Sequence, residues 1–255
     1  MENALLVGLS RQVALKRELD AVANNIANLN TTGFKADGTL FEQYLMPGAL
    51  ATQFSGPDSR VSFVRDRATW HNFAPGPIKQ TGNPLDVAIQ GEAFFAVQTP
   101  NGERYTRNGA FQVNATGELV TSDGYQVLGQ SGPIVFQPGD AAISITSEGT
   151  IRVREGGRAT SDSTRGQLRL VGFSQPRQLQ KMGSSLFTTP AGMQPQPATD
   201  ARVTQGAIEQ SNVQGVLEMT RMIDVTRAYT QLANILQQQS DLSRSTIDKL
   251  SQVPN

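Results

Sequence analysis

The chain contains no cysteine, and it has one histidine and one tryptophan among its 255 residues. The lack of cysteine excludes disulfides, thiolate metal sites and a cysteine nucleophile. A Ser-His-Asp triad would have to use His71, and the sequence has no Gly-x-Ser-x-Gly turn to carry the serine. We therefore expect His71 to be a surface or packing residue rather than a ligand or a catalytic base.

The chain also has no net charge, since its 22 Lys and Arg residues balance its 22 Asp and Glu residues. Nucleic-acid binding favours a basic face, so we expect no nucleic-acid partner. No apolar run approaches the roughly 18 residues that a membrane span requires, so we expect no membrane insertion. The apolar string Ala4–Val7 has no Lys or Arg before it, and we expect neither a secretory signal nor a transit peptide.

The usual patterns for cofactor and metal binding are missing too. The sequence has no Gly-x-x-x-x-Gly-Lys-Ser/Thr phosphate loop and no Gly-x-Gly-x-x-Gly after a predicted strand. Its acidic residues are scattered, whereas a metal site needs a cluster of ligands. Carboxylates in the middle of the chain lie mostly beside a glycine or a turn, where a structural role is expected. We therefore expect no catalytic residues, no cofactor and no metal.

The first 30 residues carry a helical apolar pattern. Apolar side chains recur at alternating spacings of four and three, at Leu15, Leu19, Val22, Ile26 and Leu29. This spacing predicts a helix that ends near Asn30–Gly33, because glycine tolerates the left-handed conformation common just past a helix. Two interpretations stay open, an amphipathic core helix or a coiled-coil arm that pairs with the C-terminal segment and with neighbouring subunits.

The C-terminal segment repeats the pattern, at Met222, Val225, Tyr229, Leu232 and Leu236. Val216, Met219 and Ile223 form an offset stripe, so the apolar surface is wider than a two-helix seam. Ser211 and Asn212 are the expected N-cap. Burying five such side chains contributes roughly 1.5–3 kcal/mol each, whereas ordering about 35 residues costs roughly 1–2 kcal/mol per residue. This helix must therefore pack against other elements, and the N-terminal helix alone is short for that purpose.

Between the two helical patterns, short apolar runs alternate with turn signals. Residues 60–69 alternate well enough for one strand, whereas residues 40–45 are expected to continue or restart a helix. From Asn83 to Phe187, strand-like runs are separated by Asn-Gly and Asp-Gly pairs, of which Asn101-Gly102 is a strong hairpin signal. Many short strands with regular turns predict an all-β domain, either sandwich-like or a partly open barrel.

These patterns predict an α+β fold, with a discontinuous terminal helical domain that is coiled-coil-like and a central all-β domain. We expect a helical assembly domain at 1–35 with 205–255, an extended connecting region at 36–80 with 188–204, and the central β domain at 81–187.

Three stretches of the chain, taken in order, carry motifs of one known family. Residues 23–35 (ANNIANLNTTGFK) resemble the N-terminal signature of flagellar rod and hook proteins. Their central domain is matched by 81–91 (TGNPLDVAIQG), Phe94-Phe95, 105–111 (YTRNGAF) and 119–129 (LVTSDGYQVLG). Their C-terminal signature is matched by 205–213 (QGAIEQSNV), Met222-Ile223 and Arg227-Ala228-Tyr229. Within the family, the opening Met1–Ser10 and the length favour a proximal rod member, with a distal rod member second.

The resemblance implies a structural subunit of the flagellar rod, which spans the periplasm and transmits torque to the hook. It implies export, without a cleaved signal, through the flagellar type III apparatus, followed by polymerisation through the terminal helices with copies of itself and with other rod proteins. Asn24 and Asn28, one turn apart on a helix, would then either link neighbours through their amides or simply face solvent. The predicted assembly residues are therefore Asn24, Asn28 and the seam residues of both helices.

Two other classes of protein remain as alternatives. A periplasmic adhesin-like binding module would carry a β head on a coiled-coil stalk and would form a soluble oligomer of fixed size. An enzyme acting on cell-wall glycan is suggested only by the periplasmic position and the carboxylates of the β region.

Overall fold

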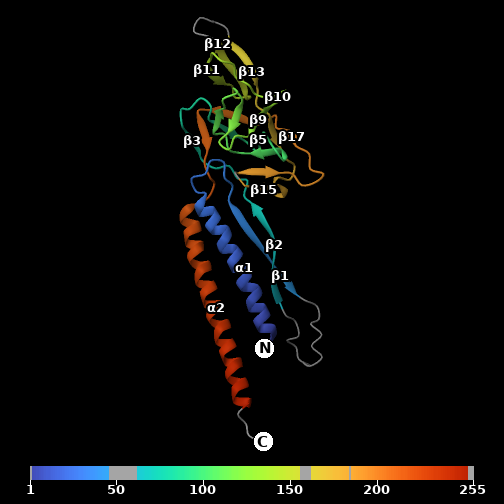
Figure 1. Ribbon diagram of the computed structural model, residues 1–255, viewed down its shortest axis with the longest axis vertical. Coiled ribbons are helices and arrows are strands. Elements are labelled where there is room, and N and C mark those ends of the chain that lie inside the picture. Colours follow the sequence, from blue (N-terminus) through green and yellow to red (C-terminus); the bar gives the residue numbers. More distant parts are fainter. Residues whose placement is uncertain (1, 46–61, 156–161, 184, 252–255) are drawn as a thin grey trace. The chain divides into compact units, whose positions relative to one another are not determined.

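The computed structural model describes residues 2–45, 62–155, 162–183 and 185–251, and its fold is α+β as predicted (Figure 1). The chain forms two compact units. The helical unit contains Met1–Ala27, Asp37–Trp70 and Gln214–Asn255. The β unit contains Asn28–Ala36 and His71–Val213. A short piece of the N-terminal region therefore belongs to the β unit, between two pieces of the helical unit.

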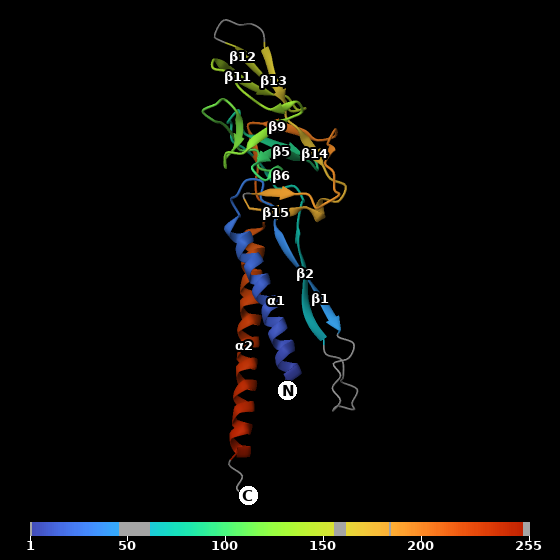
Figure 2. The ribbon, with the colours of Figure 1, turned by 45° about the vertical axis from the view of Figure 1, so that its right-hand side comes forward.

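The helical unit consists of two long helices and a two-stranded sheet. The helices are α1 (Glu2–Ala27) and α2 (Gly215–Ser251), and the strands β1 (Asp37–Leu45) and β2 (Ser62–His71) pair with each other. Figures 1 and 2 show the two helices side by side, with the β1–β2 sheet next to α1. The strand predicted at 60–69 is confirmed as β2. The helix expected at 40–45 is wrong, because these residues pair with β2 as part of β1.

The two helices run antiparallel, because residues late in α2 meet residues early in α1. The side chain of Leu236 packs on Gly8, Tyr229 accepts a hydrogen bond from Gln12, and Arg221 pairs with Glu18. With 37 residues against 26, α2 is longer by roughly 16 Å. The pairing of the terminal helices is thus present in the structure, while its coiled-coil form stays a prediction.

The β unit is built on a ten-stranded sheet. Seven strands follow the order β15-β16-β6-β5-β9-β8-β7, β10 pairs with β9, β14 pairs with β5, and β17 pairs with β14. Three smaller sheets accompany it, namely β11-β12-β13, β18-β4 and β19-β3. The strands are β3 (Ile78–Gln80), β4 (Val87–Gln90), β5 (Phe94–Thr99), β6 (Gly102–Thr106), β7 (Phe111–Val113), β8 (Leu119–Thr121), β9 (Gln126–Gly129), β10 (Gly132–Pro133), β11 (Asp140–Ile145), β12 (Thr150–Glu155), β13 (Asp162–Gln167), β14 (Leu170–Gly172), β15 (Gln180–Met182), β16 (Leu186–Thr188), β17 (Gln196–Pro197), β18 (Arg202–Gln205) and β19 (Ala207–Glu209), and one 3₁₀ turn, η1, spans Pro176–Gln178.

The hairpin predicted at Asn101-Gly102 is confirmed as β5–β6, but its two turn residues are Pro100 and Asn101, and Gly102 begins β6. Thr99 faces Gly102 in the ladder, and Gly102 has a φ of 99°, which a residue with a Cβ rarely adopts. The main apolar core of the β unit contains residues of β4, β5, β7, β8 and β9, among others. Phe95 and Phe111 are buried there and meet edge to face at 4.9 Å.

The single histidine packs against a second apolar cluster. His71 is buried, and its ring lies edge to face with Phe73 at 6.1 Å and with Phe187 at 5.9 Å. The prediction that His71 packs against neighbours is therefore confirmed. Within the ranges described, no helix has an apolar stretch long enough to cross a membrane.

One ion pair stabilises the small β11-β12-β13 sheet. Arg165, in β13, donates two hydrogen bonds to the carboxylate of Asp140, at 2.6 and 2.7 Å. The amide of Gln137 donates a third, at 2.9 Å. The bonds from Arg165 and from this backbone amide lower the pKa of Asp140 from its ordinary value of 3.8.

We predict that Asp140→Asn destabilises the β unit by about 1–2 kcal/mol at neutral pH, because it weakens charge-assisted hydrogen bonds. A carboxyl group whose pKa is lowered by folding stabilises the fold above its ordinary pKa, and this contribution is lost as the pH falls through the lowered value. The difference in urea midpoint between wild type and variant should therefore shrink as the pH is lowered from 6 to 3. A difference independent of pH would contradict this assignment.

Candidate assembly site

The predicted seam residues on the two helices are buried or half-buried, and Tyr229 and Leu236 of α2 contact α1 directly. Val22 and Val225 are buried, with exposed fractions of 1% and 6%. The others on the helices are half-buried, namely Leu15, Leu19, Ile26, Met222, Tyr229, Leu232 and Leu236. The 3–4 spacing therefore selected positions that are at least half-buried, although Ala14, Asn25 and Glu218, which it did not select, are buried as well. Whether the same residues also contact other subunits stays a prediction.

Three predicted site residues surround the end of α1. The helix ends at Ala27, earlier than expected, so Asn28 and Leu29 follow it in a turn that belongs to the β unit. The amide oxygen of Asn28 accepts a hydrogen bond from Thr31 at 3.0 Å. Asn24 is exposed on the last helical turn. Asn24 and Asn28 are therefore not one turn apart on one helix, and their contacts with neighbouring subunits stay a prediction.

Close approach of the helices near the start of α1 depends on Gly8. A Cβ at this position would lie 2.5 Å from Cδ2 of Leu236. Two polar contacts follow along the pair. The amide of Gln12 donates to the Tyr229 hydroxyl at 3.2 Å, and Arg221 donates to Glu18 at 2.9 Å. The seam is thus apolar with polar contacts at its border.

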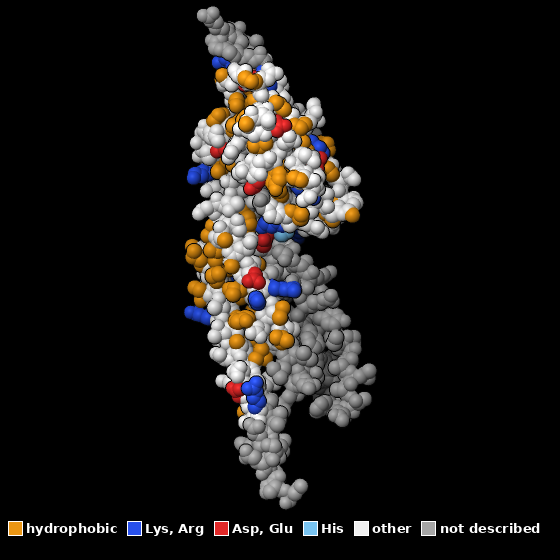
Figure 3. Space-filling view, viewed as in Figure 1, with side chains coloured by type: hydrophobic (Ala, Val, Ile, Leu, Met, Phe, Trp, Pro, Cys, Tyr) orange, Lys and Arg blue, Asp and Glu red, His pale blue; other side chains and the backbone are white. Residues whose placement is uncertain are grey.

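The outer surface of α2 carries a cluster of exposed apolar side chains close to its first residue. We call Val216, Leu217, Met219 and Ile223 the exposed patch; their exposed fractions are 83%, 60%, 52% and 53%. Figure 3 shows hydrophobic side chains gathered over this part of α2. Single exposed apolar residues are common, but four within about two turns indicate a surface that a partner covers. Three of the four form the offset stripe that the sequence predicted.

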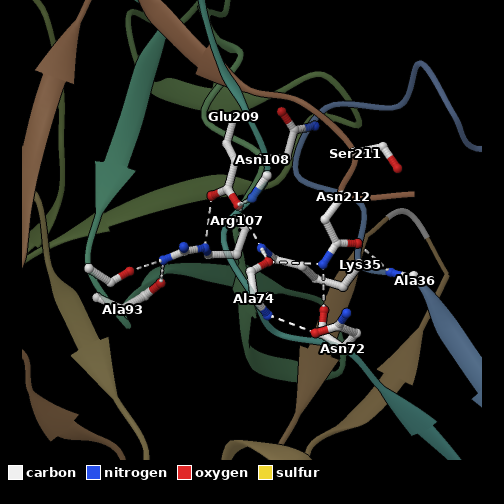
Figure 4. A network of polar contacts seen from close by, with 12 residues as sticks. Lys35, Ala36, Asn72, Ala74, Ala93, Arg107, Asn108, Glu209, Ser211 and Asn212 are labelled. Atoms are coloured by element: carbon white, nitrogen blue, oxygen red, sulfur yellow. Dashed lines mark hydrogen bonds and ion pairs between the residues drawn. The ribbon is translucent and has the colours of Figure 1, made fainter. Parts of the chain in front are cut away.

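A second feature lies inside the β unit, where the chain leaves towards each helix (Figure 4). We call Lys35, Arg107 and Glu209 the root cluster; their side chains are 1–3% exposed. Lys35 Nζ donates to Glu209 Oε1 at 2.6 Å and to the Ala74 carbonyl at 2.8 Å. The Gly76 amide donates to the same Oε1 at 2.8 Å.

Arg107 completes the root cluster on the other side of the carboxylate. Its Nε lies 2.9 Å from Glu209 Oε2, an ion pair without good hydrogen-bond geometry. Its Nη1 donates to the carbonyls of Gly91 and Ala93, at 2.8 and 2.5 Å. Two positive charges are thus held by one carboxylate and three carbonyl oxygens.

The backbone around the root cluster is tied by further hydrogen bonds. The Gly33 amide donates to the Glu209 carbonyl at 2.8 Å. Asn212 accepts from the Ala36 amide at 2.8 Å and donates to the carbonyls of Asn72 and Ala74. The expected N-cap at Ser211-Asn212 is wrong, because α2 begins at Gly215 and the Asn212 side chain is used in these bonds instead.

Burial dominates the electrostatics of the root cluster. Loss of water lowers the pKa of Lys35, and the charge and hydrogen bond of Glu209 oppose this shift. The pKa of Arg107 is lowered for the same reason, again with Glu209 acting in the opposite direction. Removing one member of such a buried group leaves an uncompensated charge and costs about 3–5 kcal/mol.

The sequence analysis did not identify the root cluster, although a signal was present. Each of three motifs, 23–35, 105–111 and 205–213, contains one charged residue, and these are Lys35, Arg107 and Glu209. A lone charged residue in an otherwise uncharged motif indicates a buried ion pair when another such motif carries a charge of the opposite sign. Among the described residues, no group of His, Asp and Glu side chains is arranged to hold a metal ion.

Comparison with known families gives three matches in chain order. Residues 5–35 match the family described as flagella basal body rod protein. Residues 88–153 match the flagellar hook protein FlgE/F/G D1 domain. Residues 204–249 match the flagellar basal body rod FlgEFG protein C-terminal region.

Curated relatives match over nearly their whole length. The flagellar basal-body rod protein FlgF of Caulobacter vibrioides is 41% identical, covering 99% of this chain and 100% of that protein. FlgF of Mesorhizobium japonicum is 38% identical, covering 98% of each. The flagellar basal-body rod protein FlgG of Bacillus subtilis is 31% identical, covering 97% of this chain and 99% of that protein.

We predict that Gly8→Val destabilises the α1–α2 pair by about 1–3 kcal/mol, because the added carbons overpack against Leu236. Gly8→Ala is the matched control. Its single carbon meets only the mobile end of Leu236, and the gain in helix propensity of about 1 kcal/mol offsets the strain. Thermal unfolding followed by circular dichroism at 222 nm measures both. Equal melting of the two variants would exclude a close approach at Gly8.

Proposed function

The chain belongs to the flagellar basal-body rod protein family, and we propose that it is a FlgF-like subunit of the proximal rod that polymerises through its two terminal helices. Proteins of this family are structural components of the bacterial flagellum, so the chain is a structural subunit of the basal body. The relatives at 41% and 38% identity are FlgF proteins, which favours the proximal position. A FlgG-like place in the distal rod is the second candidate, because a FlgG protein is 31% identical over 97% of the chain.

The observation that carries the assembly proposal is the exposed patch on α2. The seam side of α2 packs on α1, whereas Val216, Leu217, Met219 and Ile223 are more than half exposed on its other side. Burying such side chains contributes roughly 1.5–3 kcal/mol each. The patch is therefore a suitable surface for the helices of adjacent rod subunits.

The proposed role as a rod subunit also implies which partners the chain has and whether it has catalytic activity. We propose that the chain contacts copies of itself and other rod proteins, and that it is exported through the flagellar type III apparatus. The absence of cysteine suits passage as an unfolded chain, because no thiols can cross-link on the way. The relatives are structural proteins, and we propose that this chain has no catalytic activity.

We predict that Ile223→Asp abolishes incorporation into the rod but leaves the α1–α2 pair intact, because Ile223 lies on the exposed surface. Leu232→Asp should abolish incorporation and also loosen the pair, because it places a charge on the half-buried seam. Ile26→Asp should behave like Leu232→Asp. Swimming of a complemented deletion strain measures incorporation, and circular dichroism of the purified chain measures pairing.

Asn234→Asp is the control for these variants. It adds the same charge at an exposed polar position of α2 and should swim normally. Normal swimming of Ile223→Asp would remove the exposed patch from the assembly surface. Equal loss in Asn234→Asp would mean that charge on α2, and not burial of the patch, sets the outcome.

Limited proteolysis with mass spectrometry tests whether the terminal helices become ordered only on assembly. We predict loss of about residues 1–27 and 214–255 from the free chain, because the pair leaves apolar surface uncovered. The β unit should survive, with residues 28–36 and 205–213 retained, because the root cluster and the pairing of β19 with β3 hold them there. Size-exclusion chromatography should show a monomer. A uniformly resistant chain that forms an oligomer of fixed size would favour the adhesin-like module instead.

A further inference from the structure

The β1–β2 sheet packs on α1 with one face and leaves apolar side chains exposed on the other. The side chain of Asn25, in α1, exchanges two hydrogen bonds of 2.8 Å with the backbone of Asp37. Thr39 Oγ1 is buried on the strand that α1 contacts. Side chains alternate across a strand, so Gly38 and Leu40 lie on the face opposite to Thr39. Leu40 on that face is 49% exposed.

The single tryptophan lies on the same outward face. A Cβ on Gly38 would lie 2.5 Å from Cε2 of the Trp70 indole, so the ring rests directly on the Gly38 backbone. Trp70 is nevertheless 42% exposed. We call Gly38, Leu40 and Trp70 the outer sheet face. An aromatic ring that backbone supports on one side and that is exposed on the other is typical of residues that contact a partner.

The exposed apolar side chains of α2 form two groups around the helix axis. Each residue turns about 100° from the one before it, so the three residues of the offset stripe lie within about 60° of one another. The offset stripe consists of Val216, Met219 and Ile223. Leu217 points about 100° away from Val216, in the direction shared by Ile235 and Leu242, about five and seven turns further along. That long line suits another helix, whereas the compact offset stripe suits a compact surface.

The outer sheet face and the offset stripe belong to different sides of the helical unit. In both Figure 1 and Figure 2, α1 lies between α2 and the β1–β2 sheet. A contact between the two surfaces therefore joins two copies of the chain. Because the surfaces differ, the contact is head to tail and repeats along an open assembly, whereas stripe against stripe would close a two-fold dimer.

We propose that the outer sheet face is the docking site for the offset stripe of a second copy of this chain. The proposal rests on the proposed function, since it specifies which surfaces of adjacent subunits meet. The two surfaces agree in size, because the offset stripe extends about 10 Å along α2 and Gly38 to Leu40 extend about 7 Å along β1, with the indole beside them. Met219 adds a flexible thioether, which packs favourably on an aromatic ring such as that of Trp70.

The area of this contact favours a second copy over an unrelated partner. The five exposed side chains of the two surfaces carry roughly 100 Å² each, so their contact buries about 500 Å², against roughly 1,200 Å² for a stable interface. A partner held by this face alone would dissociate. A copy of the chain in a repeating assembly makes the contact with both of its surfaces and is held by helix contacts as well.

Cysteine cross-linking in basal bodies tests the contact directly, because the chain has no cysteine of its own. Leu40→Cys and Thr220→Cys are placed in two differently tagged copies and expressed together in the deletion strain. Thr220 is an exposed residue on the side of the offset stripe, whose three members stay unchanged. After mild oxidation, isolated basal bodies should contain a disulfide-linked dimer of the two tagged copies.

Asn234→Cys is the matched control for Thr220→Cys. Asn234 is exposed on the same side of α2 but about 27 Å further along the helix from Val216. Its dimer with Leu40→Cys should be at least about tenfold less abundant, because a disulfide needs Cα atoms within about 7 Å. Equal yields with Thr220→Cys and Asn234→Cys would overturn the proposal.

Other cross-links would show that something else covers the outer sheet face, and each would overturn the proposal. A higher yield of Leu40→Cys with Val13→Cys would assign the face to the exposed apolar pair of α1, Leu9 and Val13. A disulfide within one chain of the double variant Leu40→Cys/Thr220→Cys would assign it to the same copy. A product with another protein only, or no product at all, would leave no contact between copies at this face.

Tryptophan variants test the face without a cross-link. Trp70→Ala should lower the amount of chain in isolated basal bodies at least about tenfold, whereas Trp70→Phe keeps a ring on Gly38 and should lower it less than about threefold. Circular dichroism of the purified chains shows whether each variant is folded. Normal incorporation of Trp70→Ala would overturn the proposal, and if Trp70→Ala does not fold, the cross-link decides.

Immunoblotting of reduced basal bodies separates this inference from the proposed function, because it detects the chain whether or not a disulfide has formed. If the wild-type chain is absent from isolated basal bodies, the rod function is overturned. If both cysteine variants are present and no dimer forms between Leu40→Cys and Thr220→Cys, the docking site is overturned while the rod function stands.

Discussion

The buried carboxylate of Glu209 is the interaction on which the arrangement of the chain depends. It balances two cations, Lys35 and Arg107, that come from different parts of the sequence, and all three side chains are almost fully removed from water. Burial of charges is unfavourable unless hydrogen bonds satisfy them. Here one backbone carbonyl accepts from Lys35 and two accept from Nη1 of Arg107, so the cluster can form only when the segments around residues 35, 107 and 209 have reached their final places.

The helical unit differs from the β unit, since its order depends mainly on apolar contact, with the Arg221–Glu18 ion pair at the border of the seam. Val22 and Val225 are buried in the seam, but the exposed patch leaves one side of α2 uncovered. A 37-residue helix with one covered side gains little over the conformational entropy that it loses. Because apolar surface stays uncovered, the isolated helix pair is only marginally stable. The same uncovered surface is a suitable site for further helices of the same kind.

Local patterns in the sequence predicted the local features of the fold. The 3–4 spacing marked helix positions that are at least half-buried, and Asn101-Gly102 marked the place of the β5–β6 hairpin. Errors arose where distant contacts decide the outcome. Residues 40–45 form a strand because β2 pairs with them, and Asn212 does not cap α2 because it bonds to Ala36, Asn72 and Ala74. The root cluster joins residues separated by up to 174 positions, which periodicity cannot relate to one another.

The order of the helices and the β unit along the chain affects the order in which they fold. The helices lie on either side of roughly 190 residues, so pairing them directly from the unfolded chain would close a very long loop. Folding of the β unit and formation of the root cluster reduce that loop to about 12 residues, which favours pairing about 60-fold by loop length alone. The β unit is therefore expected to order first and the helices afterwards. If the chain is exported unfolded and polymerises through its helices, as proposed above, this sequence of events withholds the polymerising surface until the chain has emerged and the β unit has folded.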